Sequence, residues 1–541
     1  MRPCRFLRSP LSFVSLLLGC LALSGISQAA PPSAGGPVPL TVPKATCGPN
    51  DHPETGLQGQ VPAPLRNSFQ GFNCNLELIG QSKGDGANWQ STEFRNGNAR
   101  VCAYHGTSFS TANRTHLGVP VIDITDAANP TPAGYLQTIS MLDPWESLKV
   151  NEQRQLLAAD NGHNGGGGPE IDIYDVSTDC TAPQLLSSIA VGKADGTTGV
   201  PGAVIGHEGA WAPDGLTYYG GDLRTTINGE RGQYYAVDTT DPTAPKLITH
   251  WQTGVSNIRG FANVHGMSIS DDGTRGYFVS LGNVTGADLT NPAVAAVNGL
   301  LIYDLTEIQN RLPNPQLHLL GSVFWKDGSV AQHTIPVKIG GKPYVIFVDE
   351  GGTGGGSNIN PGPGGTPSQF DTACAAGMPP FPMARIVDTS DETHPTIVSR
   401  LALEIHNPAN CALVRPDLVG ISIFTYGSHY CSVDNKHHAT TLACGYFNSG
   451  IRVFDIRDPV RPKEIAYFNP AGTTTASPGS NHTIAGNWHP GSPDWCSAQV
   501  HLDHARGTLW TTCQDNGMLM LKFTNGVWPF PESATPPGEQ N

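Results

Sequence analysis

Residues 453–459 read Val-Phe-Asp-Ile-Arg-Asp-Pro, a short strand of β-branched and aromatic residues that runs into an Asp-rich turn. The same pattern occurs six times along the chain, at residues 121–126, 173–177, 236–242, 302–306, 386–391 and 453–459. A proline and another apolar strand follow each copy, and these prolines are Pro132, Pro183, Pro245, Pro315, Pro395 and Pro462. Each copy therefore predicts a strand, a polar turn and a second strand, repeated along the chain.

Two further strands precede each copy, most clearly at residues 266–270 and 276–279, which are separated by the turn Asp271-Asp272-Gly273. Four short strands per repeat, joined by turns of this type, are typical of a propeller blade. We therefore predict an all-β fold, a seven-bladed β-propeller of four-stranded antiparallel blades. The first strands of the blades are expected to begin near Cys74, Trp145, His207, His265, His333, His429 and Ser497.

The chain divides into four parts on this interpretation. Residues 1–30 have a basic start, an apolar run at 11–23 and small residues up to Ala30, which predicts a signal peptide and an exported protein, secreted or periplasmic. An alternative is a lipoprotein anchored through Cys20. Residues 31–70 form an N-terminal leader, 71–525 the propeller with a long loop insertion at 351–382, and 526–541 a C-terminal tail.

The cysteines favour disulfide bonds over a metal site. Of the 12 cysteines, two lie in the predicted signal peptide, and the remaining ten contain no Cys-x-x-Cys pair. Spacing suggests four pairs as inert staples: Cys431 with Cys444, Cys496 with Cys513, Cys74 with Cys102, and Cys374 with Cys411.

Composition excludes some functions. The formal net charge is -14 with only 31 Lys and Arg residues, so we expect no nucleic-acid partner. Downstream of the signal peptide, no stretch approaches the roughly 18 apolar residues of a transmembrane helix, so we expect none. The 64 Gly and 45 Pro residues suit the many turns of an all-β protein.

The Ile-x-Asp-x-x-Asp-Pro-x-x-Pro signature resembles the LVIVD repeat, which is found in exported bacterial proteins and some eukaryotic ones. The resemblance covers residues 100 to 470 by motif. It implies a propeller, and it implies no defined activity, because members of this family are largely uncharacterised.

Four histidines fall at one predicted repeat position, the start of the first strand in blades three to six: His207, His265, His333 and His429. First strands line the central channel of a propeller, so the four imidazoles can converge on one axis. Imidazoles without thiolates suit Fe, Cu or Zn, which makes these four residues candidate metal ligands. The arrangement is similar in architecture to carotenoid cleavage dioxygenases, propellers in which four histidines hold a catalytic iron, and that similarity implies a metal-dependent oxidoreductase acting on a small organic substrate.

Glu208 and Tyr430 are the candidate catalytic acid or base groups beside these histidines, and Glu146 lies near the equivalent position in blade two. Three other interpretations stay open. The histidines can be structural, as in WD-repeat propellers; a channel histidine can serve a lyase or hydrolase as general base; or the protein can be a non-catalytic scaffold whose loops hold a protein or glycan partner. Further candidate ligands are His105, His163, His501 and His504.

Overall fold

The computed structural model describes residues 41–96, 100–107, 114–162, 171–189, 206–227, 230–251, 264–282, 284, 286–354, 368–419, 424–475, 477–478 and 491–530. The predicted signal peptide lies outside the described residues. The rest of the chain, Pro39–Asn541, clusters as one compact unit.

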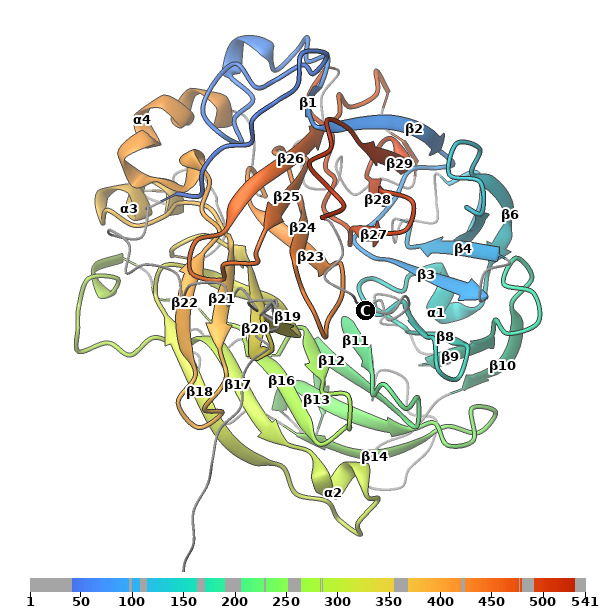
Figure 1. Ribbon diagram of the computed structural model, residues 1–541. Helices are drawn as coiled ribbons and strands as arrows, with labels where there is room; N and C mark the ends of the chain where they lie inside the picture. Colours follow the sequence, from blue (N-terminus) through green and yellow to red (C-terminus); the bar gives the residue numbers. More distant parts are fainter. Residues whose placement is uncertain are drawn as a thin grey trace, which may run out of the picture. The chain divides into compact units, whose positions relative to one another are not determined.

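Seven antiparallel sheets follow one another around a central channel, which confirms the predicted seven-bladed propeller (Figure 1). Blade one contains β3(Ser91–Asn96), β4(Arg100–His105), β5(Val119–Asp123) and β6(Thr131–Leu136). Blade two contains β7(Lys149–Asn151), β8(Leu156–Asp160), β9(Ile171–Asp175) and β10(Gln184–Ile189). Blade three contains β11(Glu208–Trp211), β12(Thr217–Ile227), β13(Glu230–Asp238) and β14(Lys246–Trp251). Blade four contains β15(Met267–Ile269), β16(Arg275–Ser280), β17(Asn298–Asp304) and β18(His318–Trp325).

Blade five contains β19(Ser329–Ile339), β20(Lys342–Gly351), β21(Ala384–Asp388) and β22(Thr396–Arg400). Blade six contains β23(Ser428–Val433), β24(Thr441–Tyr446), β25(Ile451–Asp455) and β26(Lys463–Asn469), with β1(Phe72–Cys74) as a fifth strand. Blade seven contains β27(His501–Asp503), β28(Thr508–Cys513), β29(Gly517–Phe523) and β2(Leu76–Ser82). Short helices lie between strands: α1(Ile139–Leu142), α2(Thr306–Gln309), α3(Gln369–Ala375), α4(Cys411–Val414), η1(Ala63–Leu65), η3(Gly286–Asp288), η5(Glu404–His406), η6(Pro408–Asn410) and η7(Arg415–Leu418).

The N-terminal strands close the ring, which corrects one predicted boundary. β2 pairs with β29 in the register Leu76↔Phe523 to Ser82↔Met518, so a strand from the start of the chain completes the blade formed by its end. Cys74 lies in β1 at the outer edge of blade six, and the prediction that blade one begins near it was wrong; blade one begins with β3. Both strands lie just before β3 in the sequence, and only pairing across the ring distinguishes them from a first strand.

The signature Asp ends the third strand of each of the first six blades and shapes the turn that follows. In every copy its carboxylate accepts a hydrogen bond from the main-chain N–H two residues later, at distances from 2.7 Å at Asp175 to 3.1 Å at Asp455. This local bond stabilises a turn without help from the rest of the fold. The predicted strand–turn–strand unit is therefore confirmed.

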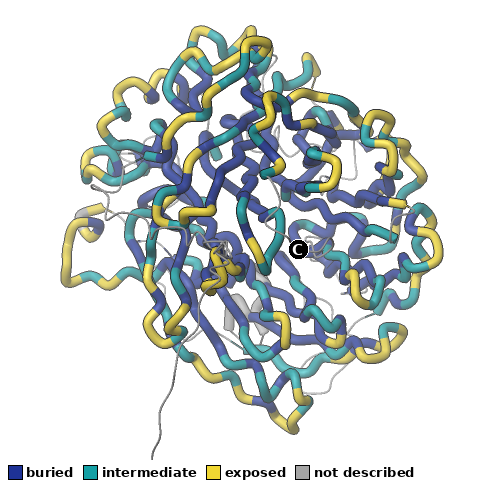
Figure 2. Tube along the Cα trace, viewed as in Figure 1, coloured by how far each residue is buried: buried dark blue, intermediate teal, exposed yellow. Residues whose placement is uncertain are grey.

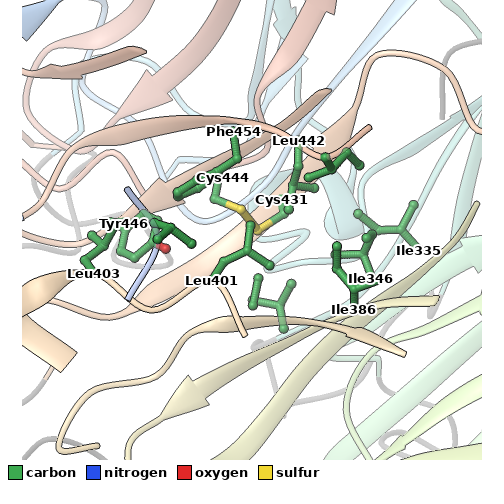
Figure 3. Close-up of a cluster of buried hydrophobic side chains, with 14 of the residues drawn as sticks. Ile335, Ile346, Ile386, Leu401, Leu403, Cys431, Leu442, Cys444, Tyr446 and Phe454 are labelled. Atoms are coloured by element: carbon green, nitrogen blue, oxygen red, sulfur yellow. A yellow bond between two sulfur atoms is a disulfide. The ribbon is translucent and has the colours of Figure 1, made fainter. Parts of the chain in front are cut away.

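Hydrophobic cores lie between neighbouring blades. The largest cluster packs blade five against blade six, and Figure 3 shows Ile335, Ile346 and Ile386 facing Leu442 and Phe454 across the Cys431–Cys444 disulfide. Figure 2 shows that the inner strands are buried, while exposed residues gather at the outer turns. Each blade thus buries both faces of its sheet against its neighbours, which holds the first strands around the channel.

Five disulfide bonds link all ten cysteines of the described residues. Cys431–Cys444, Cys496–Cys513 and Cys374–Cys411 confirm three predicted pairs, and the last joins α3 to α4, so the described end of the 351–382 insertion is partly helical. The Cys74–Cys102 pair was wrong, because Cys74 lies in blade six and Cys102 in blade one, which are not neighbours: the bonds are Cys47–Cys74 and Cys102–Cys180. Five disulfides are typical of a protein outside the cytoplasm. Within the described residues, no helix is long and apolar enough to cross a membrane.

Candidate metal centre

One position at the inner start of each first strand faces the same level of the channel, and we call it the ring position. Strand registers align the blades on it, because they fix which first-strand residue lies opposite which second-strand residue. In blades one to seven it holds Trp89, Glu146, His207, His265, Gln332, His429 and Ala498. Blades two, three, four and six therefore place one carboxylate and three imidazoles at one level.

These four side chains meet at the carboxylate. Oε2 of Glu146 lies 3.2 Å from Nε2 of His207 and 3.2 Å from Nε2 of His265, and its Oε1 lies 3.2 Å from Nε2 of His429. Glu350 of β20 approaches the same nitrogen of His429 at 3.4 Å. Donor atoms of Glu146, His207 and His265 all lie within 4.8 Å of one another, so this buried group could hold a metal ion.

The main chain of the next blade orients two of the imidazoles. Nδ1 of His265 lies 2.8 Å from the carbonyl oxygen of Ala331, and Nδ1 of His429 lies 2.9 Å from that of Ser497. When Nδ1 donates to a carbonyl, Nε2 carries the lone pair that a metal requires, and the ring is held in place. The indole of Trp145 donates to Nε2 of His207 at 2.9 Å.

The charges of the group depend on one another. Burial raises the pKa of Glu146, but its contacts with His207, His265 and His429 outweigh burial and hold that pKa well below its ordinary value. Burial lowers the pKa of His429, but hydrogen bonds to Glu146 and Glu350 prevail and raise it to about 10; the same balance raises the pKa of His265. The buried carboxylate therefore needs positive charge beside it, which either protonated imidazoles or a metal cation can supply.

Aromatic side chains cover the group. Trp89 and Phe447 lie with ring centroids 5.3 and 5.4 Å from that of His429, and Trp145 lies 5.4 Å from His207. Trp495 is buried in the same aromatic cluster. The cluster excludes water from the group, which strengthens every electrostatic interaction inside it.

His333 lies elsewhere. It follows Gln332, which holds the ring position, so the predicted alignment of His333 with the other three histidines was wrong by one residue. Its Nε2 lies 3.3 Å from the carbonyl oxygen of Cys431, its ring stacks on Tyr430 at 4.7 Å, and burial lowers its pKa to about 3. Blade five has one more residue than blades three and four between the ring position and the turn glycine: nine positions separate Gln332 from Gly341, against eight from His207 to Gly215 and from His265 to Gly273.

A cavity of about 390 Å³ fills the channel on one side of the ring position. Its lining residues follow the ring position along the first strands, as in 149–153, 208–211 and 430–433, so the cavity extends toward the turns between first and second strands. At its inner end, Lys149 Nζ lies 3.0 Å from Oε1 of Glu208, and the Tyr430 hydroxyl donates to Oε2 of Glu208. Here Glu208, Tyr430, Lys149 and His333 form what we call the channel floor.

The predicted catalytic residues are thus brought together in the channel floor. Burial raises the pKa of Glu208 to about 7, although Lys149 opposes the shift, and burial together with Glu146 and Glu208 raises the pKa of Tyr430 well above its ordinary value. A carboxyl group with a pKa near neutrality can both accept and donate a proton at physiological pH. Lys149 and Glu350 were missed by sequence reasoning, because their roles arise only from contacts across the channel.

Other predicted ligands have other partners. Nδ1 of His105 lies 2.9 Å from the carbonyl oxygen of Gly106, and His501, a cavity wall residue, stacks on Trp510. His504 packs against Trp528. His163 lies outside the described residues.

No protein-family model matches the chain, and no curated protein matches it in sequence. Many solved structures match the fold of this chain, and three of them illustrate the level of similarity. The hydrazine synthase of Kuenenia stuttgartiensis is 12% identical with a TM-score of 0.46, covering 82% of this chain and 97% of the solved one. A protein of Lactobacillus plantarum is 12% identical with a TM-score of 0.44, covering 76% and 88%. A provisionally named 6-phosphogluconolactonase of Bacteroides fragilis is 10% identical with a TM-score of 0.43, covering 78% and 93%.

Such low identities carry no information on activity. The LVIVD resemblance stays a prediction.

Proposed function

We propose that the protein is an exported metal-dependent enzyme of the oxidoreductase type, which acts on a small organic substrate in the channel. The observation that carries this proposal is the convergence of Glu146, His207, His265 and His429 from four separate blades. Residues in equivalent places of a repeat protein usually share a structural role, yet blades one, five and seven keep the fold with Trp, Gln and Ala at the ring position. The four-residue set is therefore not required for a blade to form.

The donor set indicates the kind of metal. Three imidazoles and a carboxylate suit Fe, Cu or Zn, whereas Mg and Ca prefer oxygen ligands alone. Such an ion, when bound, would polarise a substrate or take part in electron transfer. His265 and His429 are already directed by main-chain carbonyls, so little reorganisation is needed for their Nε2 atoms to bind it.

The channel floor would handle protons beside this centre. Glu208 follows His207 in the chain and Tyr430 follows His429, so both side chains of the hydrogen-bonded pair are tied to candidate ligands. The same pair supports a second candidate, a lyase or hydrolase in which a channel group acts as general base. Export to the periplasm or the exterior fits both candidates and is supported by the five disulfides.

A third candidate needs no catalysis. The imidazoles of His265 and His429 can neutralise Glu146 by themselves, which makes the group a buried ion-pair cluster in a scaffold that binds a protein or glycan partner.

Metal content separates this candidate from the first. The mature protein, purified without a histidine tag and without chelators, should contain about one Fe, Cu or Zn per chain by mass spectrometry. His429→Ala should lose that metal. His406→Ala, which removes a similarly buried histidine bonded to main-chain groups of Leu403 and Pro382, should keep it. If the wild-type protein contained no detectable Fe, Cu or Zn, the proposal of a metalloenzyme would be refuted.

A further inference from the structure

We propose that the channel cavity binds a hydroxyl-bearing aromatic or alicyclic molecule of one to two rings, with its hydroxyl group against Lys149 and Glu208. This inference rests on the proposed function, because it names the substrate class of that same channel.

The size of the cavity sets the size of the molecule. An engineered protein cavity of roughly 150 Å³ holds one benzene ring. The channel cavity of about 390 Å³ therefore has room for two fused or linked rings with one substituent.

The walls are of mixed character. Apolar residues from four blades line the cavity, namely Trp211, Met267, Ile269, Ile335, Val500 and Leu502. Polar residues lie beside them, among them Thr92, Ser268, Thr334, Ser432 and His501. At the mouth, Asp271 pairs with His437 at 3.4 Å and lies 4.0 Å from Lys436. Charged groups thus stand at the mouth and at the floor, and the apolar side chains between them offer surface to the apolar part of an occupant.

The floor favours one uncharged hydroxyl group. The Lys149 ammonium has three N–H donors and gives one to Glu208, while each Glu208 oxygen accepts one bond and can accept another. A hydroxyl group can accept from Lys149 and donate to Glu208 at once. A carboxylate head would instead face the Glu208 carboxyl, with the buried Glu146 carboxylate behind it. A hydrocarbon would offer no hydrogen-bond partner to the remaining donors and acceptors of the floor.

One floor atom is unused. Nδ1 of His333 is buried and has no hydrogen-bond partner among the described residues. This atom adds to the polar character of the channel floor. Because Glu208 and Tyr430 follow His207 and His429 in the chain, the hydroxyl group of the occupant would lie beside the candidate metal centre.

Binding of three probes tests the inference: 2-naphthol, 2-naphthoate and naphthalene, measured by titration calorimetry or equilibrium dialysis with the full mature protein at pH 7. We expect 2-naphthol to bind about tenfold more tightly than either other probe, the effect of one satisfied pair of hydrogen bonds. Lys149→Met should reduce its binding to the level of naphthalene. Equal or tighter binding of 2-naphthoate, or no binding of any probe, would overturn the inference.

Two cavity-filling variants are used, so that the test remains possible if one of them misfolds. Ile335→Trp and Ser268→Phe narrow the cavity from two blades, and whichever keeps the wild-type circular dichroism spectrum should lose binding at least about tenfold. Leu320→Trp, a half-buried position in the outer strand of blade four, is the control and should bind normally. Metal is measured on the same samples. Metal without binding refutes the inference alone, and selective binding without metal refutes the proposed function and leaves the binding site standing.

Discussion

His265→Ala should abolish the effect of a chelator on thermal stability, whereas His406→Ala should preserve it. Both histidines are 1% exposed, and each makes two polar contacts: His265 with Ala331 and Glu146, His406 with Leu403 and Pro382. Truncation of either ring leaves a cavity and unpaired groups, at a cost of about 3 kcal/mol. The two variants thus match in structural damage and differ in their relation to the metal centre.

The size of the chelator effect follows from mass action. A metal ion present at 100 times its dissociation constant stabilises the folded state by about 2.7 kcal/mol. The compact unit Pro39–Asn541 has roughly 500 residues, so its entropy of unfolding is about 1 kcal/mol per kelvin at roughly 2.1 cal/mol/K per residue. Removal of the metal should therefore lower Tm by about 3 °C, and each truncation should lower it by a similar amount.

Scanning calorimetry with and without EDTA measures both effects. The wild-type protein and His406→Ala should each lose about 3 °C on addition of EDTA, and His265→Ala should lose nothing further. An unchanged EDTA effect in His265→Ala, or no EDTA effect in the wild-type protein, would show that the ring-position group binds no metal.

Three further predictions concern other parts of the chain. His333→Ala should retain the metal. Gln332→His, which adds an imidazole at the ring position of blade five, should slow the loss of metal to a chelator. Loss of metal in His333→Ala, or no slowing in Gln332→His, would contradict the strand register. Burial and a neighbouring carboxylate raise the pKa of Asp494 to about 8, so the folded protein holds a proton that the unfolded chain releases above about pH 4. Stability should then fall as pH rises from about 4 to 8, and Asp494→Asn, which mimics the protonated form, should flatten this profile in pH-dependent denaturant titrations. Replacing Cys102 and Cys180 by Ser should cost about 4.5 kcal/mol, because their loop spans 78 residues, and a loss under 1 kcal/mol by urea titration would contradict that disulfide.

Much of the candidate site could be read from repetition. His207, His265 and His429 align by sequence because each lies at the start of a first strand, and Glu146 falls near the same place in blade two. His333 could not be excluded, because the turn glycine that guided the alignment lies one residue further from the ring position in blade five than in blades three and four. Glu350 comes from a second strand, where no repeat pattern marks it.

The sequence by itself determined the blade, because the alternation of strands and the hydrogen bond of each signature Asp act over a few residues. Only the tertiary structure decided how the ring closes, which cysteines pair, and which side chains meet in the channel. β2 pairs with β29, which lies more than four hundred residues later in the chain, and Cys102 forms a disulfide bond with Cys180 in the next blade. Those partners are selected by packing between blades, which buries apolar surface without leaving a local sequence mark. Glu146 lies within 3.2 Å of three imidazoles because the ring brings four blades to one axis.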